Sequence, residues 1–347
     1  MLDYREFAST PVTASESPRP LPTVENTAFK LPKTITVADD EKGFDEFLSG
    51  SGTVAWIVLQ NGQLVDERYY DGYSRSSTVP SFSVAKSLVG ALVAIAHGRR
   101  EIQDLDEAIT VRLPKLAQAD RGWGKVTWQH LLDMRSGVNF KEDYADLNSD
   151  IAKMYLGDDI ASLSLSLRLS GKPDKQFAYN SANTQLLAMA LEQATGKNIA
   201  DQLEERLWQP FGAEFDATWS TDRAKPASLK AFCCLNARAI DFARFGQLIL
   251  DHGRVGSREV IPSSWIDRLL TKANNGKSYA DQWWLLRDTN ERGASGALLA
   301  EGILGQFVFV DPQSRVVIVR MGHREDSLPW RTIFKAIANA NPIPTTP

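Results

Sequence analysis

The sequence predicts an α+β fold in which an antiparallel sheet is flanked by helices and carries an inserted all-helical subdomain. Three observations support this prediction. Segments with strand patterns occur in pairs near both ends of the chain, and because each pair alone is only marginally stable, we expect the pairs to share one sheet. The long segment between them has helical periodicity. With 347 residues, the chain can also form more than one structural layer.

The first 40 residues are expected to form an extended arm without chemistry, since residues 8–33 are rich in Pro, Ser and Thr. The N-terminus has acidic residues and lacks the run of roughly 7 to 15 apolar residues that marks a secretory signal. The longest apolar stretch, 88–96, is shorter than the roughly 20 residues that span a bilayer. We therefore expect a cytoplasmic protein that binds no membrane. A chain trimmed of its signal would be periplasmic and would look the same.

The first strand pair is defined by its turn. Residues 53–60 and 63–70 flank Asn61-Gly62. Asn-Gly between two strand-like runs is the strongest short-range signal of a β-hairpin. We expect the antiparallel sheet to begin here.

Residues 81–96 predict a helix that is apolar on nearly every side and is buried between layers. Ser83 and Lys86 are three residues apart, so a helix places them within contact distance near its N-terminus, where unpaired N–H groups favour negative charge. A serine hydroxyl attacks when a base takes its proton, and burial lowers the pKa of a lysine towards that role. The spacing also fits a capping serine and a solvent-reaching lysine, an alternative that the apolar surroundings disfavour.

The middle of the chain is predicted to be mostly helical. Residues 185–195 form a helical pattern that stops at Gly196, and residues 238–250 form another before Gly253. Near the end of the chain a second strand pair and a closing helix follow, at 306–310, 315–320 and 330–340. We therefore expect an arm at 1–40, a sheet domain from 41–105 and 273–347, and a helical subdomain at 106–272.

The composition excludes several classes of protein. A net charge of −4 is too acidic for non-specific nucleic-acid binding. Cys233 and Cys234 are adjacent and cannot easily form an unstrained bridge, so a disulfide scaffold is excluded. The four histidines are scattered and no motif has metal-ligand spacing, so we expect no metal and no cofactor.

Several ordered motifs occur together in the chain. They are Ser83-Val-Ala-Lys86, residues 126–137, and Phe177-Ala-Tyr-Asn-Ser181 before the helix that ends at Thr195-Gly196. In this combination the sequence resembles the β-lactamase-related serine hydrolases. Residues 233–246 and 302–306 resemble the branch that contains 6-aminohexanoate-dimer hydrolase. The resemblance covers roughly residues 40–340 and implies the β-lactamase/transpeptidase-like fold of class C β-lactamases and penicillin-binding proteins.

The resemblance also implies roles for individual residues. Ser83 is the expected nucleophile, with Lys86 and Tyr179 handling its proton. The family motif containing this tyrosine is Tyr-x-Asn, and here Ser181 replaces the asparagine, which makes Ser181 a candidate substrate contact. Tyr144 lies on a polar loop that is expected to close over the site. A partly buried Tyr179 with a bonded hydroxyl, and a Tyr144 that is only a loop aromatic, are the alternatives.

The family's Lys-Thr-Gly motif matches Ala300-Glu301-Gly302, so its lysine is absent. That lysine would grip a substrate carboxylate, and its loss argues against β-lactams and D-alanyl peptides. The backbone N–H groups of Ser83 and Ile303 are expected to form the oxyanion hole, with Gly302 beside the substrate. A plain glycine-containing strand is the alternative at this position.

The predicted activity is hydrolysis of an amide or carboxylic ester of a small molecule through an acyl-enzyme on Ser83. One alternative is a β-lactamase or D-alanyl-D-alanine carboxypeptidase. Another is a non-catalytic ligand sensor that kept the fold but lost turnover. The oligomeric state stays open.

Overall fold

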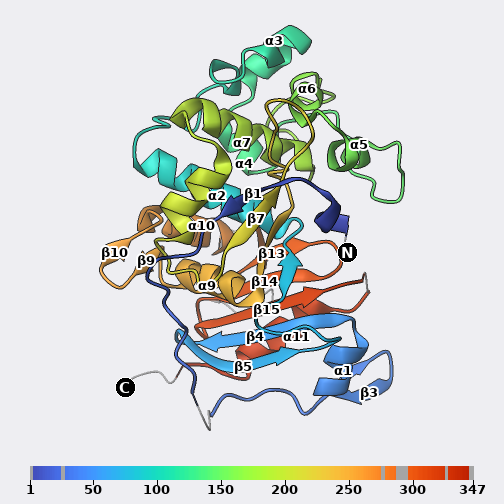
Figure 1. Cartoon of the computed structure of the whole chain (residues 1–347), viewed down its shortest axis with the longest axis vertical. Helices are drawn as coiled ribbons and strands as arrows, with labels where there is room; N and C mark the ends of the chain where they lie inside the picture. The colour runs from blue at the N-terminus through green and yellow to red at the C-terminus, as the bar shows by residue number, and fades with distance from the viewer. Residues whose placement is uncertain (1–2, 25–27, 275–277, 287–295, 325–326, 344–347) are drawn as a thin grey trace.

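A seven-stranded antiparallel sheet forms the lower half of the molecule (Figure 1). The computed structural model describes residues 3–24, 28–274, 278–286, 296–324 and 327–343. In sheet order the strands are β11 (Tyr279–Ala280), β12 (Trp283–Leu286), β13 (Ala297–Gly302), β14 (Gln306–Asp311), β15 (Val316–Gly322), β4 (Thr53–Gln60) and β5 (Gln63–Tyr69).

Both predicted strand pairs are confirmed. Asn61 and Gly62 have φ angles of 51° and 77°, the left-handed conformation that a two-residue hairpin turn requires. β4 pairs with β15 as well as with β5, and Trp56 lies opposite Arg320. The two ends of the chain therefore meet in one sheet, as the strand pairs predicted.

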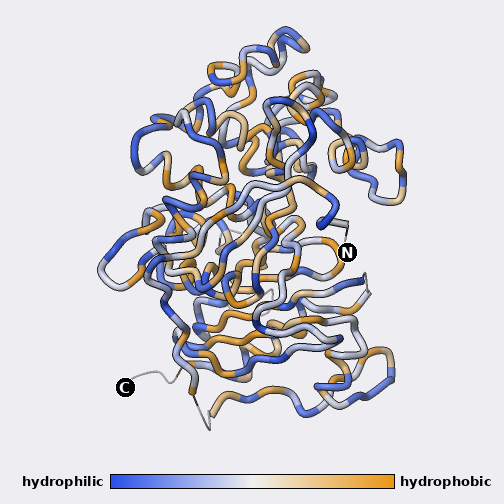
Figure 2. The backbone as a smooth tube through the Cα atoms, in the orientation of Figure 1, coloured by the Kyte–Doolittle hydropathy of each residue, from blue (hydrophilic) through white to orange (hydrophobic). Residues whose placement is uncertain are grey.

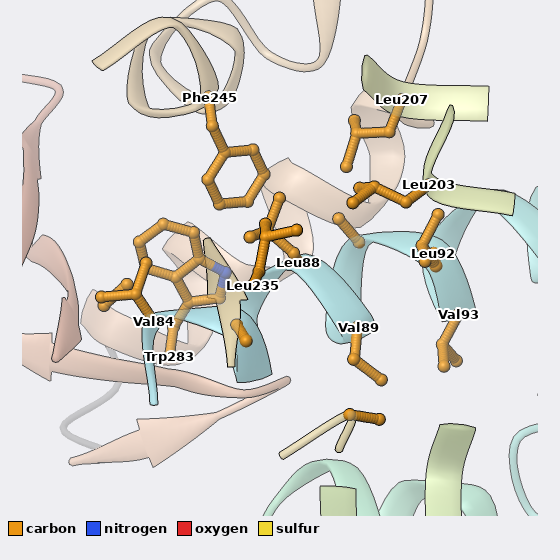
Figure 3. Packing of buried hydrophobic residues seen from close by; sticks show 14 of the residues in the cluster. Val84, Leu88, Val89, Leu92, Val93, Leu203, Leu207, Leu235, Phe245 and Trp283 are labelled. Atoms are coloured by element: carbon orange, nitrogen blue, oxygen red, sulfur yellow. The ribbon is translucent and has the colours of Figure 1, made fainter. Parts of the chain in front are cut away.

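Helix α2 (Val84–Gly98) is the buried helix of the sequence prediction. Its residues from Val84 to Ala96 are all buried. Its side chains pack against Leu203 and Leu207, and against Phe245 and Trp283 (Figure 3). Because the helix lies between layers, its first turn is held firmly beside the sheet.

Helices cover both faces of the large sheet. Helix α9 (Ala239–Leu250) packs on β4, β14 and β15 on one side. A second apolar cluster includes residues of α1 (Phe44–Gly50) and α11 (Trp330–Asn339) together with strand residues such as Trp56 and Phe309. Figure 2 shows apolar segments along many of these strands. The closing helix is thus confirmed as part of the sheet layer.

The upper half of Figure 1 is mostly helical, as expected for the inserted segment. Helix α7 (Ser181–Thr195) ends at Gly196, whose φ of 70° provides the left-handed C-terminal cap. The other helices of this segment are α3 (Lys115–Ala119), α4 (Trp128–Leu132), α5 (Asp150–Leu156), α6 (Ile160–Leu165) and α8 (Ile199–Leu203), with short helical turns at η2 (Ile109–Val111), η3 (Arg121–Lys125) and η4 (Glu204–Trp208). A further short turn, η1 (Asp3–Glu6), lies in the N-terminal arm.

The inserted segment also contains strands, which the sequence analysis did not expect. A second sheet has the order β1 (Ser9–Val12), β7 (Ala217–Ser220), β8 (Leu235–Arg238), β6 (Thr78–Pro80). Part of the predicted arm thus forms an edge strand, a position where the missing N–H of Pro11 is tolerated. Two small hairpins complete the described strands, β2 (Thr34–Val37) with β3 (Asp40–Gly43) and β9 (Arg254–Val255) with β10 (Arg258–Glu259).

The predicted boundaries at 106 and 272 stay a prediction. Helix α9 lies within that range, yet it packs on the large sheet, and α10 (Ser263–Asn274) contacts β11, β12 and β13. Residues 1–2 and 25–27 of the predicted arm lie outside the described residues. Within the described chain, none of the helices has the length and apolar character needed to cross a membrane.

Cys233 and Cys234 are joined by a disulfide bond, which their adjacency led us not to expect. The backbone turns at Cys234, where φ is 73°. This bridge closes only a local turn beside the candidate site and does not staple distant parts of the fold.

Candidate active site

Ser83 lies where β6 leads into α2. The N–H of Ser81 donates to the carbonyl of Leu235 at 2.8 Å, which ties this junction to β8. Ser83 is the N-cap residue of α2, but its side chain makes no capping hydrogen bond. Only 8% of the residue is exposed. The capping alternative is therefore wrong for the Ser83 hydroxyl, which points elsewhere.

The Ser83 hydroxyl lies against Lys86. Lys86 Nζ is 2.8 Å from Ser83 Oγ and donates a second hydrogen bond of 2.8 Å to the carbonyl oxygen of Phe232. The side chain is 1% exposed, so the alternative of a solvent-reaching lysine is wrong. Burial lowers the pKa of Lys86 to about 8, while the negative charge of Glu142 opposes that shift. A substantial fraction of Lys86 is therefore neutral near pH 8.

Tyr179 completes the group around Ser83. Its ring is stacked on Trp284 with centroids 5.4 Å apart and meets Tyr279 edge-on at 5.8 Å. Lys86 Nζ lies 5.3 Å from the ring centroid. Burial raises the pKa of Tyr179, and a hydrogen-bonding interaction with the Ser83 hydroxyl opposes that rise. Tyr179 thus stays protonated at neutral pH and lies beside both predicted partners.

The loop that holds Tyr179 is fixed by backbone and side-chain hydrogen bonds. The N–H of Ala178 donates to the carbonyl of Met134 at 2.9 Å. Asn180 caps α7 by accepting from the N–H of Asn183, and the Ser136 hydroxyl donates to Asn183 Oδ1 at 2.6 Å. Residues 133–137 and the start of α7, far apart in sequence, therefore orient Tyr179 together.

Gly302, at the end of β13, lies against the start of α2. A Cβ atom at Gly302 would lie 2.9 Å from the backbone nitrogen of Ser83 and 2.8 Å from the carbonyl oxygen of Ser81. Only glycine leaves this space open without movement of the backbone. The next residue, Ile303, borders the same space as Ser83 in two cavities. The arrangement suits an oxyanion site between two chain segments.

Glu142 organises the predicted substrate contacts and was not identified from the sequence. Its carboxylate accepts from the N–H of Ser181 at 2.8 Å, from the Ser181 hydroxyl at 2.7 Å and from the Tyr144 hydroxyl at 2.6 Å. The carboxylate thereby lies at the N-terminus of α7, where negative charge is favoured. Burial and this carboxylate raise the pKa of Tyr144. No spacing rule connects residues 39 positions apart, so the sequence carried no signal for this contact.

Two cavities meet at Ser83. The first has a volume of about 310 Å³ and the second about 280 Å³. Both are bordered by Ser83, Tyr144 and Ile303. The first is further lined by Phe82, Leu147, Ile151, Ala152, Tyr155, Leu156, Ser181, Phe232, Cys233 and Leu304. The second is further lined by Tyr179, Trp284, Glu301, Gly302, Gly305, Phe307, Leu328, Trp330 and Arg331.

A family model described as beta-lactamase matches residues 44–341. The chain belongs to the beta-lactamase family. It is 28% identical over 337 residues to 6-aminohexanoate-dimer hydrolase of Paenarthrobacter ureafaciens, which is 90% of this chain and 83% of that protein.

Solved structures agree with this membership of the beta-lactamase family. A putative 6-aminohexanoate-dimer hydrolase from Bacillus anthracis matches with a TM-score of 0.82 and 26% identity, over 95% of this chain and 89% of the other. A family VIII carboxylesterase matches with a TM-score of 0.67 and 15% identity, over 86% of this chain and 94% of the other. This match shows the shared fold. The β-lactamase/transpeptidase fold and the assignment to the serine hydrolases of this family are confirmed. The roles of single side chains stay predictions.

The position of the family's Lys-Thr-Gly motif has a different chemistry here. Glu301 pairs with Arg331 of α11, and the Arg331 guanidinium lies 4.9 Å from the ring centroid of Trp284. This pair was not identified from the sequence, because the two residues are 30 positions apart and belong to different elements. Of the neighbouring tryptophans, Trp283 belongs to the core and Trp284 to the second cavity.

Within the described residues, no three His, Cys, Asp or Glu side chains are grouped so that they could hold a metal ion. The groups that surround Ser83 are instead a lysine, a tyrosine and backbone amides. Such a set supports proton transfer and stabilisation of an oxyanion.

Proposed function

We propose that the chain hydrolyses an amide or carboxylic ester bond of a small molecule through an acyl-enzyme on Ser83. The observation that supports this most directly is the 2.8 Å contact between Lys86 Nζ and Ser83 Oγ. Burial lowers the pKa of that lysine to about 8, which makes it a base at mildly alkaline pH. The names of similar proteins include a 6-aminohexanoate-dimer hydrolase and a family VIII carboxylesterase, in agreement with either bond.

The proposed reaction begins with neutral Lys86 accepting the proton of Ser83. Ser83 Oγ then attacks the carbonyl carbon, and the N–H groups of Ser83 and Ile303 stabilise the oxyanion. Tyr179, protonated because its pKa is raised, donates a proton to the departing nitrogen or oxygen as the acyl-enzyme forms. A water molecule, activated by the same groups, releases the acid and restores Ser83.

The second cavity disfavours the β-lactam and D-alanyl peptide alternative. Such substrates carry a carboxylate that the family's lysine would bind. Here Ala300 occupies that position, and Glu301 adds a carboxylate to the cavity wall. Arg331 is already paired with Glu301, so it offers a substrate anion only a partly neutralised charge.

The test is hydrolysis of p-nitrophenyl butyrate at pH 8.5, about where Lys86 is mostly neutral. We expect Ser83→Ala to lose at least about 10³-fold in kcat/KM. Ser87→Ala is the matched control, since Ser87 is buried on the same helix but donates to the carbonyl of Gln282. Retained hydrolysis in Ser83→Ala would overturn the proposal, and a stable adduct without turnover would favour the ligand sensor.

A further inference from the structure

The two cavities differ in whether Tyr179, the proposed proton donor, lines them. Tyr179 borders the second cavity and does not line the first. In the proposed function, on which this inference rests, Tyr179 protonates the leaving group. The leaving group must therefore occupy the second cavity, and the acyl part of the substrate must extend from Ser83 into the first.

The walls of the first cavity carry no charge. Among the described residues that line it, all side chains are apolar, aromatic or hydroxylic, apart from the disulfide-bonded Cys233. In the described chain, only four large hydrophobic side chains are exposed. Tyr144, Leu147 and Leu156 are three of them, and all three line this cavity. Apolar groups exposed together at a cavity mark a binding surface for an apolar ligand.

Besides Lys86, two charged groups of the described chain bond to residues that line this cavity without lining it themselves. Glu142 accepts hydrogen bonds from the N–H and hydroxyl of Ser181 and from Tyr144. Lys230 Nζ lies behind the wall, where it donates to the carbonyl of Tyr155 and stands 4.4 Å from the ring centroid of Phe7. Among the described residues, neither a carboxylate nor an ammonium group lines this cavity, so a charged end of a substrate chain would be buried there without a direct ion-pair partner.

The wall itself is held in place from outside. Helix α5 supplies Ile151, Tyr155 and Leu156 to the lining. The ring of Phe7, on the N-terminal arm, meets the ring of Tyr155 edge-on with centroids 5.2 Å apart. Together with the bond from Lys230, this contact holds Tyr155 of α5 in place, so the apolar wall exists before substrate binds.

We infer that the first cavity is an acyl subsite for an uncharged, apolar acyl chain, and that it rejects chains ending in a cation. A volume of about 310 Å³ suits a medium-length chain. A 6-aminohexanoyl group would place an ammonium against this apolar wall. The substrate class is therefore amides or esters of medium-chain apolar carboxylic acids.

The decisive experiment uses two p-nitrophenyl esters of the same shape. The acyl groups are 7,7-dimethyloctanoyl and 6-(trimethylammonio)hexanoyl, which differ by a carbon in place of a positively charged nitrogen. We expect wild type to favour the neutral ester by at least about 100-fold in kcat/KM. Along the straight-chain esters from acetate to hexanoate, kcat/KM should rise about fourfold for each methylene group.

A matched pair of variants tests whether the preference for the neutral ester arises in the first cavity. Leu147→Asp places a carboxylate at the rim, and since Leu147 is 78% exposed, folding does not depend on its side chain. We expect this change to reduce the ratio of kcat/KM for the neutral ester to kcat/KM for the cationic ester by at least about tenfold. Val111 is the fourth exposed hydrophobic, 61% exposed and outside both cavities. Val111→Asp should leave the ratio and the activity unchanged.

Ser83→Ala, assayed with the same esters, separates this inference from the proposed function. Hydrolysis that does not need Ser83 would overturn both. Hydrolysis that needs Ser83 but is equal or faster with the cationic ester would overturn the inference alone. An equal response to Leu147→Asp and Val111→Asp would also overturn it, whereas a response confined to Leu147→Asp would support it.

Discussion

The two cavities both border Ser83 but differ in chemistry. The first is walled by apolar and aromatic side chains, mainly from α5 and the loop before it. The second combines Tyr179 and Trp284 with the ion pair of Glu301 and Arg331. If the proposed roles hold, the difference teaches that the reaction and the selection of substrate are built from separate parts. Changes at Ser83 should affect every substrate, while changes in one cavity should depend on one half of the substrate.

The largest effect is expected from Lys86→Met, which removes the proposed base beside Ser83. We expect kcat/KM to fall by about 10⁴-fold for every substrate, whatever its acyl or leaving group. Lys230→Met is the matched control. Lys230 is also buried with a pKa lowered to about 8, but it bonds the carbonyl of Tyr155 instead of Ser83. Activity with p-nitrophenyl acetate should stay within about tenfold, and an equal loss in both variants would break the assignment.

A smaller and more selective loss is expected from Tyr179→Phe. Amides need a protonated leaving nitrogen, whereas p-nitrophenolate leaves without a proton. We therefore expect about 10³-fold loss with a p-nitroanilide and only about tenfold loss with the matching p-nitrophenyl ester. Tyr279→Phe is the control, because that ring contacts Tyr179 and Trp284 but lines neither cavity. A loss of kcat/KM in Tyr179→Phe that varies with the acyl chain instead of the leaving group would mean that the acyl chain occupies the second cavity and the leaving group the first.

Gly302→Ala tests the expected oxyanion hole beside the backbone nitrogen of Ser83. The added methyl group would lie 2.9 Å from the Ser83 nitrogen, where the oxyanion is expected. We expect about 10²-fold loss in kcat with all substrates and little change in their relative order. Gly124→Ala is the control, since no atom lies within 4 Å of a Cβ at that position. Unchanged turnover in Gly302→Ala would contradict the oxyanion assignment.

The smallest effect concerns pH. Below about pH 8 Lys86 is protonated and cannot accept the Ser83 proton, so kcat/KM should rise with pH and level off above that value. Glu142 raises the pKa of Lys86, so Glu142→Gln should move this rise to lower pH, with a loss of activity of about tenfold or less.

Glu259→Gln is a close control for that pH measurement. Glu259 accepts from the N–H and hydroxyl of Ser263 at the start of α10, as Glu142 does from Ser181 at the start of α7. Its replacement should leave the pH profile in place. A profile that stays unchanged in Glu142→Gln as well would mean that Glu142 acts only as a structural anchor.

Local sequence signals were sufficient for much of the fold and for the centre of the site. Asn61-Gly62 determines a hairpin because few residues adopt its backbone angles. Ser83 and Lys86 are brought together by one helical turn, so their contact follows from spacing. Tyr179 was found through the motif around it, because its partners lie far away in the chain.

Contacts between distant segments could not be predicted. Glu142 meets Ser181, and Glu301 meets Arg331, only because the tertiary fold places their elements together. The same holds for the edge strand β1, whose partner β7 lies about two hundred residues away in the chain. The linings of the two cavities combine residues from such distant segments, so the cavities could not be identified from the sequence.

The most direct test of the Ser83 acyl-enzyme is to trap it. Wild type and Ser83→Ala would be mixed with p-nitrophenyl 7,7-dimethyloctanoate, quenched in acid within the first turnover, digested and mapped by mass spectrometry. We expect an acyl group on the peptide that contains Ser83, and none in the variant. An acyl group on another residue, or release of p-nitrophenol in a burst without any adduct at Ser83, would contradict the assignment.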